Sequence, residues 1–248
     1  MSLNKPLKRT VRQLIDNSYS NNGNSRYINH PDYAKAPENY LRAFYILLND
    51  FNSLLDYIEP ADLNLKTYSY RIHELLLRTC IEVEANFVAI LSENGYKKSG
   101  NWNINDFKKV NNSHHLSSYK ILLPNWKGDS NVRKPFKAWK ENSSLSWFKA
   151  YNKTKHDRFS EFEQANFKNL TDSICGLAVL LASQFLNNSF PPTNTLLSFG
   201  GPSDGMDISI GKYFRIKLPR DWSEDEKYEF NWSNLQTENS PIDTYKYQ

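Results

Sequence analysis

Apolar residues recur at steps of three and four along four separate stretches of the chain, a spacing that places them on one face of an α-helix. The first stretch begins at Pro37, a favourable first-turn residue, and ends before Pro60. The second spans about residues 68–94 and stops at Gly95. Its apolar stripe consists of Ile72, Leu75, Leu76, Thr79, Val83, Phe87 and Ile90. The spacing therefore predicts two long amphipathic helices.

Two further helices are predicted in the second half of the chain. One follows the serines at 143–144 and contains Trp147. The other follows the sequence Ser-Glu-Phe-Glu at 160–163, which has the form of a capping box, and runs to about residue 185. Between residues 176 and 181 it is apolar nearly all round, so we expect it to be the most buried element.

The remaining segments carry weaker patterns. Residues 8–17 predict a short helix, and residues 96–143 are irregular apart from a short helix near 105–110. Residues 207–218 alternate β-branched or aromatic residues with polar ones, which predicts a strand. Residues 228–232 are the expected partner of this strand in a hairpin.

Together these patterns predict a mainly α protein: an antiparallel up-and-down helical bundle with a small C-terminal β-hairpin appendage. The expected organisation is an N-terminal polar segment at 1–36, the helical bundle at 37–190 and a C-terminal extension at 191–248. We expect Cys80 and Cys175, which lie within apolar helical patterns, to be buried free thiols.

Charge and composition narrow the choice of partners. The chain has 31 basic and 27 acidic residues, so an anionic partner has to be held by a local patch rather than by bulk attraction. No stretch reaches about 18 apolar residues, and no apolar leader follows the first residues. We therefore expect a cytoplasmic protein with no membrane partner.

The most unusual short segment lies at 147–158, where polar side chains gather at the end of a predicted helix. Asn152, Lys155 and His156 are three and four residues apart and share one helical face. Histidine transfers protons near neutral pH, and a cation such as Arg158 contacts phosphate, so these are parts of a metal-independent ribonuclease. The structural alternative is that they cap the helix and pair with a charged stripe that begins at Arg71. Residue chemistry alone favours that alternative.

The order of helices, with an Asn-x-x-Lys-His sequence between the last two, resembles the HEPN superfamily of helical bundles. Many members of that family are ribonucleases or toxins of prokaryotic conflict systems, and others are non-catalytic binding modules. The family motif is an Arg, a polar residue that is often Asn, three variable residues and a His. Asn152 and His156 match it, whereas Tyr151 occupies the position of the Arg. Members that have lost this Arg are often inactive as nucleases.

The resemblance covers residues 37–187 as helix order and implies a protein that binds RNA or a nucleotide, with endoribonuclease activity as the enzymatic expectation. His156 would transfer protons and Asn152 would orient a phosphate or ribose. Lys155 and Arg158 would contact phosphate beside Tyr151. The family site commonly forms across two subunits, which implies a homodimer.

Either of two arginines is a candidate to replace the missing motif Arg, namely Arg158 or Arg71. No cofactor fingerprint, metal-ligand set or convincing nucleophile is present in the sequence, and the adjacent histidines at 114–115 are a weak candidate for a metal site.

The alternative function is a non-catalytic protein-interaction module, in which residues 112–143 or the C-terminal extension bind a protein partner. The basic and aromatic residues at 133–140 are compatible with stacking on single-stranded nucleic acid. We favour a simpler reading for that stretch: a solvated loop whose aromatic side chains pack on the core.

Overall fold

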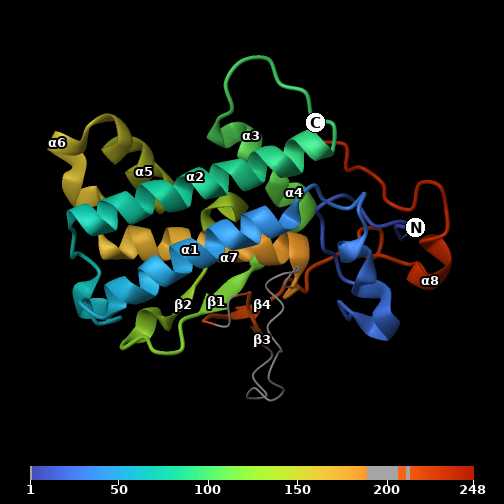
Figure 1. Ribbon diagram of the computed structural model, residues 1–248, viewed down its shortest axis with the longest axis horizontal. Coiled ribbons are helices and arrows are strands. Elements are labelled where there is room, and N and C mark those ends of the chain that lie inside the picture. The colour runs from blue at the N-terminus through green and yellow to red at the C-terminus, as the bar shows by residue number, and fades with distance from the viewer. Residues whose placement is uncertain (1, 189–205, 211–212) are drawn as a thin grey trace.

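The computed structural model describes residues 2–188, 206–210 and 213–248. Three long helices lie side by side: α1 (Pro37–Leu55), α2 (Tyr70–Glu93) and α7 (Phe167–Phe185) (Figure 1). The shorter α5 (Ser146–His156) packs against α2 and α7. The predicted mainly helical class is confirmed, and each of the four amphipathic stretches contains one of these helices.

Short elements connect and flank the long helices. The remaining α-helices are α3 (Ile104–Lys108), α4 (Val110–His114), α6 (Arg158–Glu161) and α8 (Trp232–Leu235). The 3-10 helices are η1 (Asn21–Asn29), η2 (Asp62–Asn64), η3 (Leu116–Ser118), η4 (Asp129–Asn131), η5 (Lys137–Glu141) and η6 (Phe162–Gln164). Within the described residues, no helix combines the length and apolar character needed to cross a membrane.

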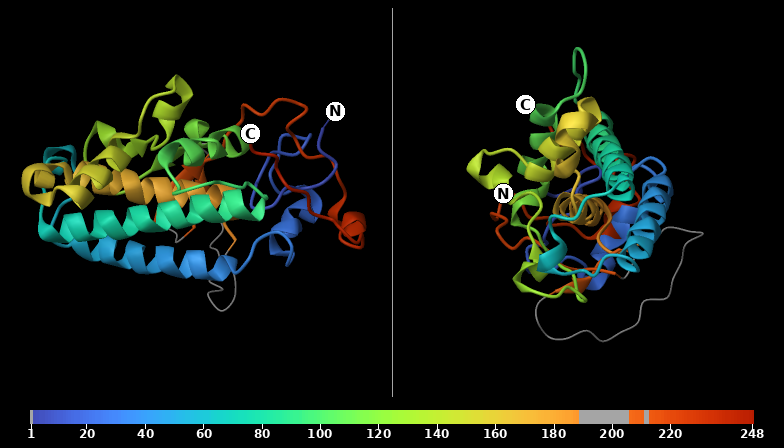
Figure 2. Two further views of the ribbon diagram at one scale, coloured as in Figure 1. Left: turned by 90° about the horizontal axis from the view of Figure 1, so that it is seen from above. Right: turned by 90° about the vertical axis from the view of Figure 1, so that its left-hand side faces the viewer.

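Contacts at both ends fix the directions of the long helices. An isolated β-bridge between Tyr68 and Asn166, which lie just before α2 and α7, holds the starts of these two helices together. Near their ends, the Gln184 side chain donates a hydrogen bond of 3.0 Å to Asn86 Oδ1, so these two helices run parallel. α1 runs the opposite way, and its C-terminal half packs along the N-terminal half of α2 (Figure 2).

α7 is the central helix, and every residue in it except Lys168 is buried. The expectation that this segment is the most buried element is confirmed. Gly176 allows α5 to approach closely, because a Cβ at this position would lie 3.1 Å from Cζ2 of Trp147. The apolar stripe predicted for α2 is buried along its whole length.

The start of α7 differs from the prediction. Asn166, not the capping-box sequence at 160–163, is the N-cap, and its side chain accepts a hydrogen bond of 3.1 Å from the Asn169 amide. Residues 160–163 fall within α6 and η6 instead. The helical run is interrupted because Ala165 leaves the helical conformation and Asn166 is extended.

The strands form one small antiparallel sheet in the order β2-β1-β4-β3. β1 (Lys120–Leu122) pairs with β2 (Val132–Arg133) and with β4 (Arg215–Lys217), which in turn pairs with β3 (Asp207–Ile208). Ile121 and Ile216 lie opposite each other and are both buried. β4 therefore pairs with β1 and β3 rather than with residues 228–232, because its apolar side chain faces the core beside β1.

The N-terminal segment forms no helix at 8–17, contrary to the prediction. Its backbone bonds to distant parts of the chain, including a 2.9 Å bond from the Val11 amide to the Ser183 carbonyl. The Arg9 side chain is fully buried and lies 2.8 Å from Glu93 and 2.9 Å from Gln184. These tertiary bonds outweigh the weak local helical pattern.

The C-terminal segment packs against the N-terminal segment at one end of the long helices (Figures 1 and 2). Tyr228 is fully buried, and its backbone forms isolated β-bridges with both Leu3 and Leu14. Among the described residues, Phe214, Tyr228 and Ile242 belong to the main hydrophobic core, so this extension is integrated with the helices rather than appended to them.

Two smaller predictions are confirmed. Cys80 and Cys175 are free and buried, and burial raises the pKa of both thiols. In the stretch 133–140, Phe136 and Trp139 are buried against the core while its lysines are exposed. That stretch offers no exposed aromatic ring for stacking.

Candidate functional site

The polar segment identified in the sequence lies where α5 ends and α6 begins. Asp157 leaves the helical conformation, with φ −136° and ψ 78°, and its carboxylate accepts a hydrogen bond of 3.0 Å from the Ser160 amide. Asp157 is therefore the N-cap of α6, and hydrogen bonds from Ser160 hold its pKa below the usual range. This residue has the structural role that the alternative interpretation gives it.

The turn at Asp157 leaves the cationic side chains around it in solvent. Lys155, His156 and Arg158 are exposed, and Asn152 is half-buried one helical turn before His156. Within the described part of the chain, the side chain of His156 makes no hydrogen bond and no ion pair. Its imidazole is therefore free to contact a ligand, but no described side chain orients it.

Tyr151, at the position of the family's Arg, is buried between α5 and α2. Its hydroxyl donates to Glu84 Oε2 at 3.3 Å and accepts from Lys155 Nζ at 3.1 Å. Burial raises the pKa of Tyr151, and its hydrogen bond to the lysine raises the pKa of Lys155. Tyr151 therefore presents no charge of its own and instead positions the ammonium group of Lys155.

Exposed aromatic rings lie beside these cations. The Arg158 guanidinium lies 5.5 Å from the centroid of the Tyr70 ring, and that ring packs against Phe162 with centroids 4.9 Å apart. Tyr70 is 67% exposed and Phe159 is 99% exposed. We call the set Lys155, His156, Arg158, Phe159 and Tyr70 the α5–α6 end.

The two aromatic members of the α5–α6 end were missed by the sequence interpretation. Phe159 lies directly between Arg158 and Ser160 in a polar turn, and Tyr70 falls outside the apolar stripe of its helix. An apolar side chain off the buried face is the sequence signal that identifies such residues.

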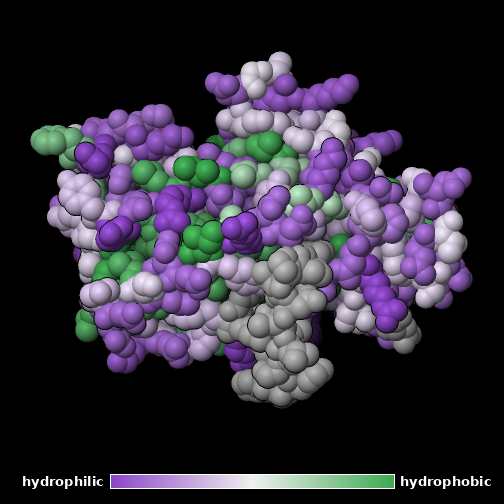
Figure 3. Space-filling view, in the orientation of Figure 1, coloured by the Kyte–Doolittle hydropathy of each residue, from purple (hydrophilic) through white to green (hydrophobic). Residues whose placement is uncertain are grey.

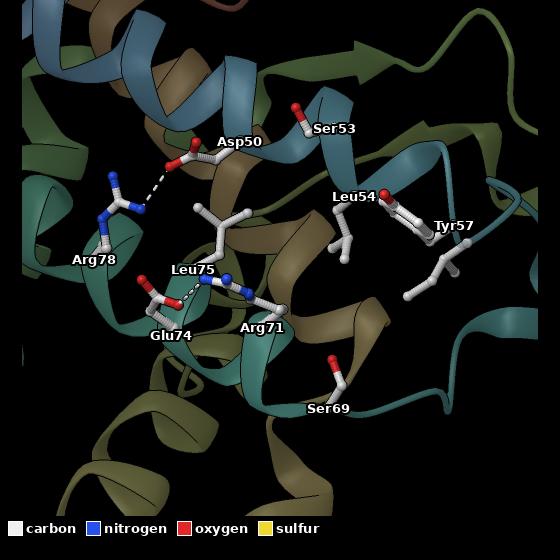
Figure 4. Close-up of a pocket in the computed structure, with 10 residues that line it drawn as sticks. Asp50, Ser53, Leu54, Tyr57, Ser69, Arg71, Glu74, Leu75 and Arg78 are labelled. Carbon is white, nitrogen blue, oxygen red and sulfur yellow. Dashed lines mark hydrogen bonds and ion pairs between the residues drawn. The ribbon is translucent and has the colours of Figure 1, made fainter.

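Arg71 occupies a different place. It lines a groove of about 840 Å³ between α1 and α2, where its Nη1 lies 3.1 Å from Glu74 Oε2 (Figure 4). Further along the same groove, Arg78 Nη1 forms an ion pair with Asp50 Oδ2 at 2.6 Å. No α5 residue lines this groove, so the structure does not bring Arg71 together with His156.

The face of the molecule formed by α1 and α2 exposes both hydrophobic and polar side chains. Green hydrophobic patches break the hydrophilic surface over α1 and α2 (Figure 3). Leu54, Ile58 and Leu75 line the groove, and Tyr57 at its end is 88% exposed. The groove is thus amphipathic, with two ion pairs along it.

The adjacent histidines have separate structural roles. His114 is buried, with Nε2 2.8 Å from the Arg9 carbonyl and Nδ1 2.7 Å from Ser113 Oγ. His115 stacks on Trp222, with ring centroids 4.0 Å apart. In the described residues, no group of three or more His, Cys, Asp or Glu side chains is arranged to hold a metal ion.

Comparison of the chain with known proteins adds no family assignment. No protein-family model matches the sequence, and neither the curated proteins nor the solved structures give a match.

Proposed function

We propose that this chain binds RNA or nucleotide phosphates at the α5–α6 end, as an HEPN-like up-and-down helical bundle of a prokaryotic defence or toxin system. The observation that carries the proposal is the exposure of Lys155, His156 and Arg158 beside the exposed rings of Tyr70 and Phe159. Cations contact the phosphates of single-stranded nucleic acid, and its bases stack on aromatic side chains.

The geometry of α5 supports a specific division of roles. Lys155, held by the Tyr151 hydroxyl at 3.1 Å, presents its ammonium group in a preferred position. Arg158 offers a guanidinium that is suited to two phosphate oxygens. Binding thus depends on these two cations, while Tyr151 acts only by positioning Lys155.

Cleavage of RNA is the enzymatic extension of this proposal. One imidazole would take the proton of a ribose 2′-hydroxyl, and a protonated imidazole would give a proton to the leaving 5′-oxygen. A single chain offers one such group, His156, with Asn152 one turn away to orient the phosphate. A homodimer that joins two α5–α6 ends would bring two copies of His156 to one phosphodiester, as the family resemblance implies.

The test compares wild type with His156→Ala on a mixed pool of structured and unstructured RNA without added metal. Cleavage by the wild type that disappears in the variant supports a histidine-dependent ribonuclease. Binding by both proteins without cleavage supports a binding module. Neither binding nor cleavage at high protein concentration contradicts the proposed function.

A second candidate is the non-catalytic protein-interaction module, and the α1–α2 groove is the observation that favours it. In the described residues of the docking segments expected from the sequence, Tyr119 and Trp139 in 112–143 and Tyr228 in the C-terminal extension are buried and so are not open to a partner. A partner that binds the groove should be lost with Tyr57→Ser and retained by His156→Ala. The opposite pattern would exclude the groove.

A further inference from the structure

A second cavity lies at the opposite end of α5 from His156. It has a volume of about 610 Å³ and lies between the β2–η5 segment and the first residues of α5. Four cationic side chains line it, together with three carboxylates: Arg133, Lys134, Lys137 and Lys168, with Asp129, Glu141 and Asp172. We call this the α5 cavity.

Arg133 is the unusual member of the α5 cavity because its charge is buried and incompletely paired. Its side chain is only 8% exposed, and its guanidinium stacks over Trp126 at 4.5 Å. Nη1 lies 3.3 Å from Asp172 Oδ1, a long contact. Nε and Nη2 are shielded from solvent and have no hydrogen-bond partner in the described residues. Buried N–H groups rarely remain unpaired, since leaving them so is unfavourable.

Asp172 does not depend on Arg133 for its charge balance. The Lys168 ammonium lies 2.8 Å from its second oxygen, on the neighbouring turn of α7. If Arg133 turned towards another anion, Lys168 would still neutralise the carboxylate. Asp129 and Glu141 offset Lys134 and Lys137 in number, so the cavity has a surplus of one positive charge, and that charge belongs to Arg133.

The first turn of α5 faces the same cavity and has no side-chain cap. Leu145 is the N-cap residue, and it offers no side-chain acceptor for the amides of the first turn. Ser144, Leu145, Ser146 and Trp147 line the cavity. A helix of 11 residues such as α5 carries partial positive charge at this end, which favours an oxyanion.

We propose that the α5 cavity binds a phosphate group, carried by a nucleotide or by RNA. The phosphate accepts hydrogen bonds from the uncapped amides of α5 and from the unpaired N–H groups of Arg133, which shifts towards it from Asp172. Lys137 adds positive charge at the rim. This site is independent of the α5–α6 end, since the two lie about 16 Å apart along α5.

The test is a titration of the full chain with inorganic phosphate, followed by the ¹H–¹⁵N signals of the backbone amides at 146–148. Saturable shifts of these amides are expected in the wild type. Arg133→Gln is expected to weaken binding about tenfold or more, because charge-assisted hydrogen bonds are lost. Absence of saturable shifts, or equal affinity in this variant, would overturn the proposal.

Two surface variants keep the test decisive if Arg133→Gln fails to fold. Lys137→Gln removes an exposed cation that lines the cavity, and Lys140→Gln is its matched control because Lys140 is exposed outside it. Ser146→Pro removes one amide donor at a position where proline suits the start of a helix and follows an extended residue. Lys137→Gln and Ser146→Pro should weaken phosphate binding and Lys140→Gln should not; equal affinity in all three contradicts the site.

Competition separates the two sources of the phosphate. Displacement of inorganic phosphate by adenosine monophosphate and by 5′-phosphorylated RNA, but not by 5′-hydroxyl RNA, assigns the site to terminal phosphates. Displacement by 5′-hydroxyl RNA as well assigns it to the RNA backbone. Displacement by none of the three overturns the assignment to nucleotides and RNA. Because Arg158→Gln alters only the α5–α6 end, retained phosphate binding in that variant distinguishes this site from the proposed function.

Discussion

At the scale of single residues, His114 shows how burial fixes a protonation state. Its ring lies between the Arg9 carbonyl and Ser113 Oγ, a pattern satisfied by a neutral ring that donates through Nε2 and accepts at Nδ1. Burial lowers the pKa of His114 to about 3. Because the unfolded chain binds a proton at a higher pH than the folded chain does, stability is lost as the pH falls below about 6.5.

We predict that the free energy of unfolding falls by about 1 kcal/mol between pH 7 and about pH 5.5 because of His114 alone. Urea denaturation of wild type and His114→Gln at both pH values measures this difference. The variant starts from a lower stability but should lose less of it on acidification. An equal loss in both proteins would show that another group carries the pH dependence.

The same scale shows what the sequence can say about the candidate site. The spacing of Asn152, Lys155 and His156 places them on one helical turn without knowledge of the fold, and they do lie together on α5. The burial of Tyr151 and its contact with Glu84 depend on how α5 packs against α2, which no local pattern encodes. The exposure of Tyr70 likewise depends on how α6 and η6 pack beside the start of α2.

At the scale of elements, the start of α7 depends on one amide side chain. Asn166 accepts from the Asn169 amide at 3.1 Å and donates to the Glu163 carbonyl at 3.0 Å. Asn166→Ala removes both bonds, so we predict a loss of about 1 kcal/mol in the free energy of unfolding, measured in urea.

Asn49→Ala is the matched control, since Asn49 is exposed within α1 and alanine is the better helix former. Its stability should stay equal to the wild type or rise slightly. A loss as large as that of Asn166→Ala would mean that the cap has no special role.

The elements that were predicted well are those with long amphipathic patterns. The four principal helices were identified because each buries a continuous apolar stripe. The pairing of β4 with β1 was not predicted, because the two strands are far apart in sequence and each is only three residues long. The absence of a helix at 8–17 has the same cause, since its backbone partners include Ser183 and Asp243.

At the scale of the whole molecule, Tyr228 joins the two terminal segments. Its buried hydroxyl accepts from the Leu7 amide at 3.0 Å and donates to the Thr10 carbonyl at 2.8 Å. We predict that Tyr228→Phe lowers the free energy of unfolding by about 1–3 kcal/mol, because two buried backbone groups lose their partner. Thermal and urea unfolding measure the change; an unchanged stability would show that these bonds contribute nothing net.

Because the C-terminal extension contributes residues to the core, it cannot be studied by simple deletion. Among its described residues, Ile216 pairs with β1 and Tyr228 belongs to the core. Deletion of residues 191–248 therefore removes part of the core as well as any docking surface. Point substitutions on exposed residues are the sound way to map a partner on this molecule.

The claim that RNA phosphates bind at the α5–α6 end is tested most directly by fluorescence anisotropy with labelled single-stranded RNA at several salt concentrations. Arg158→Gln is compared with Arg42→Gln. The second variant removes the same charge from an exposed position near the N-terminal end of α1. We predict weaker binding for Arg158→Gln, with the slope of log affinity against log salt reduced by about 0.7, and wild-type behaviour for Arg42→Gln. Identical affinities and slopes in all three proteins would contradict the account.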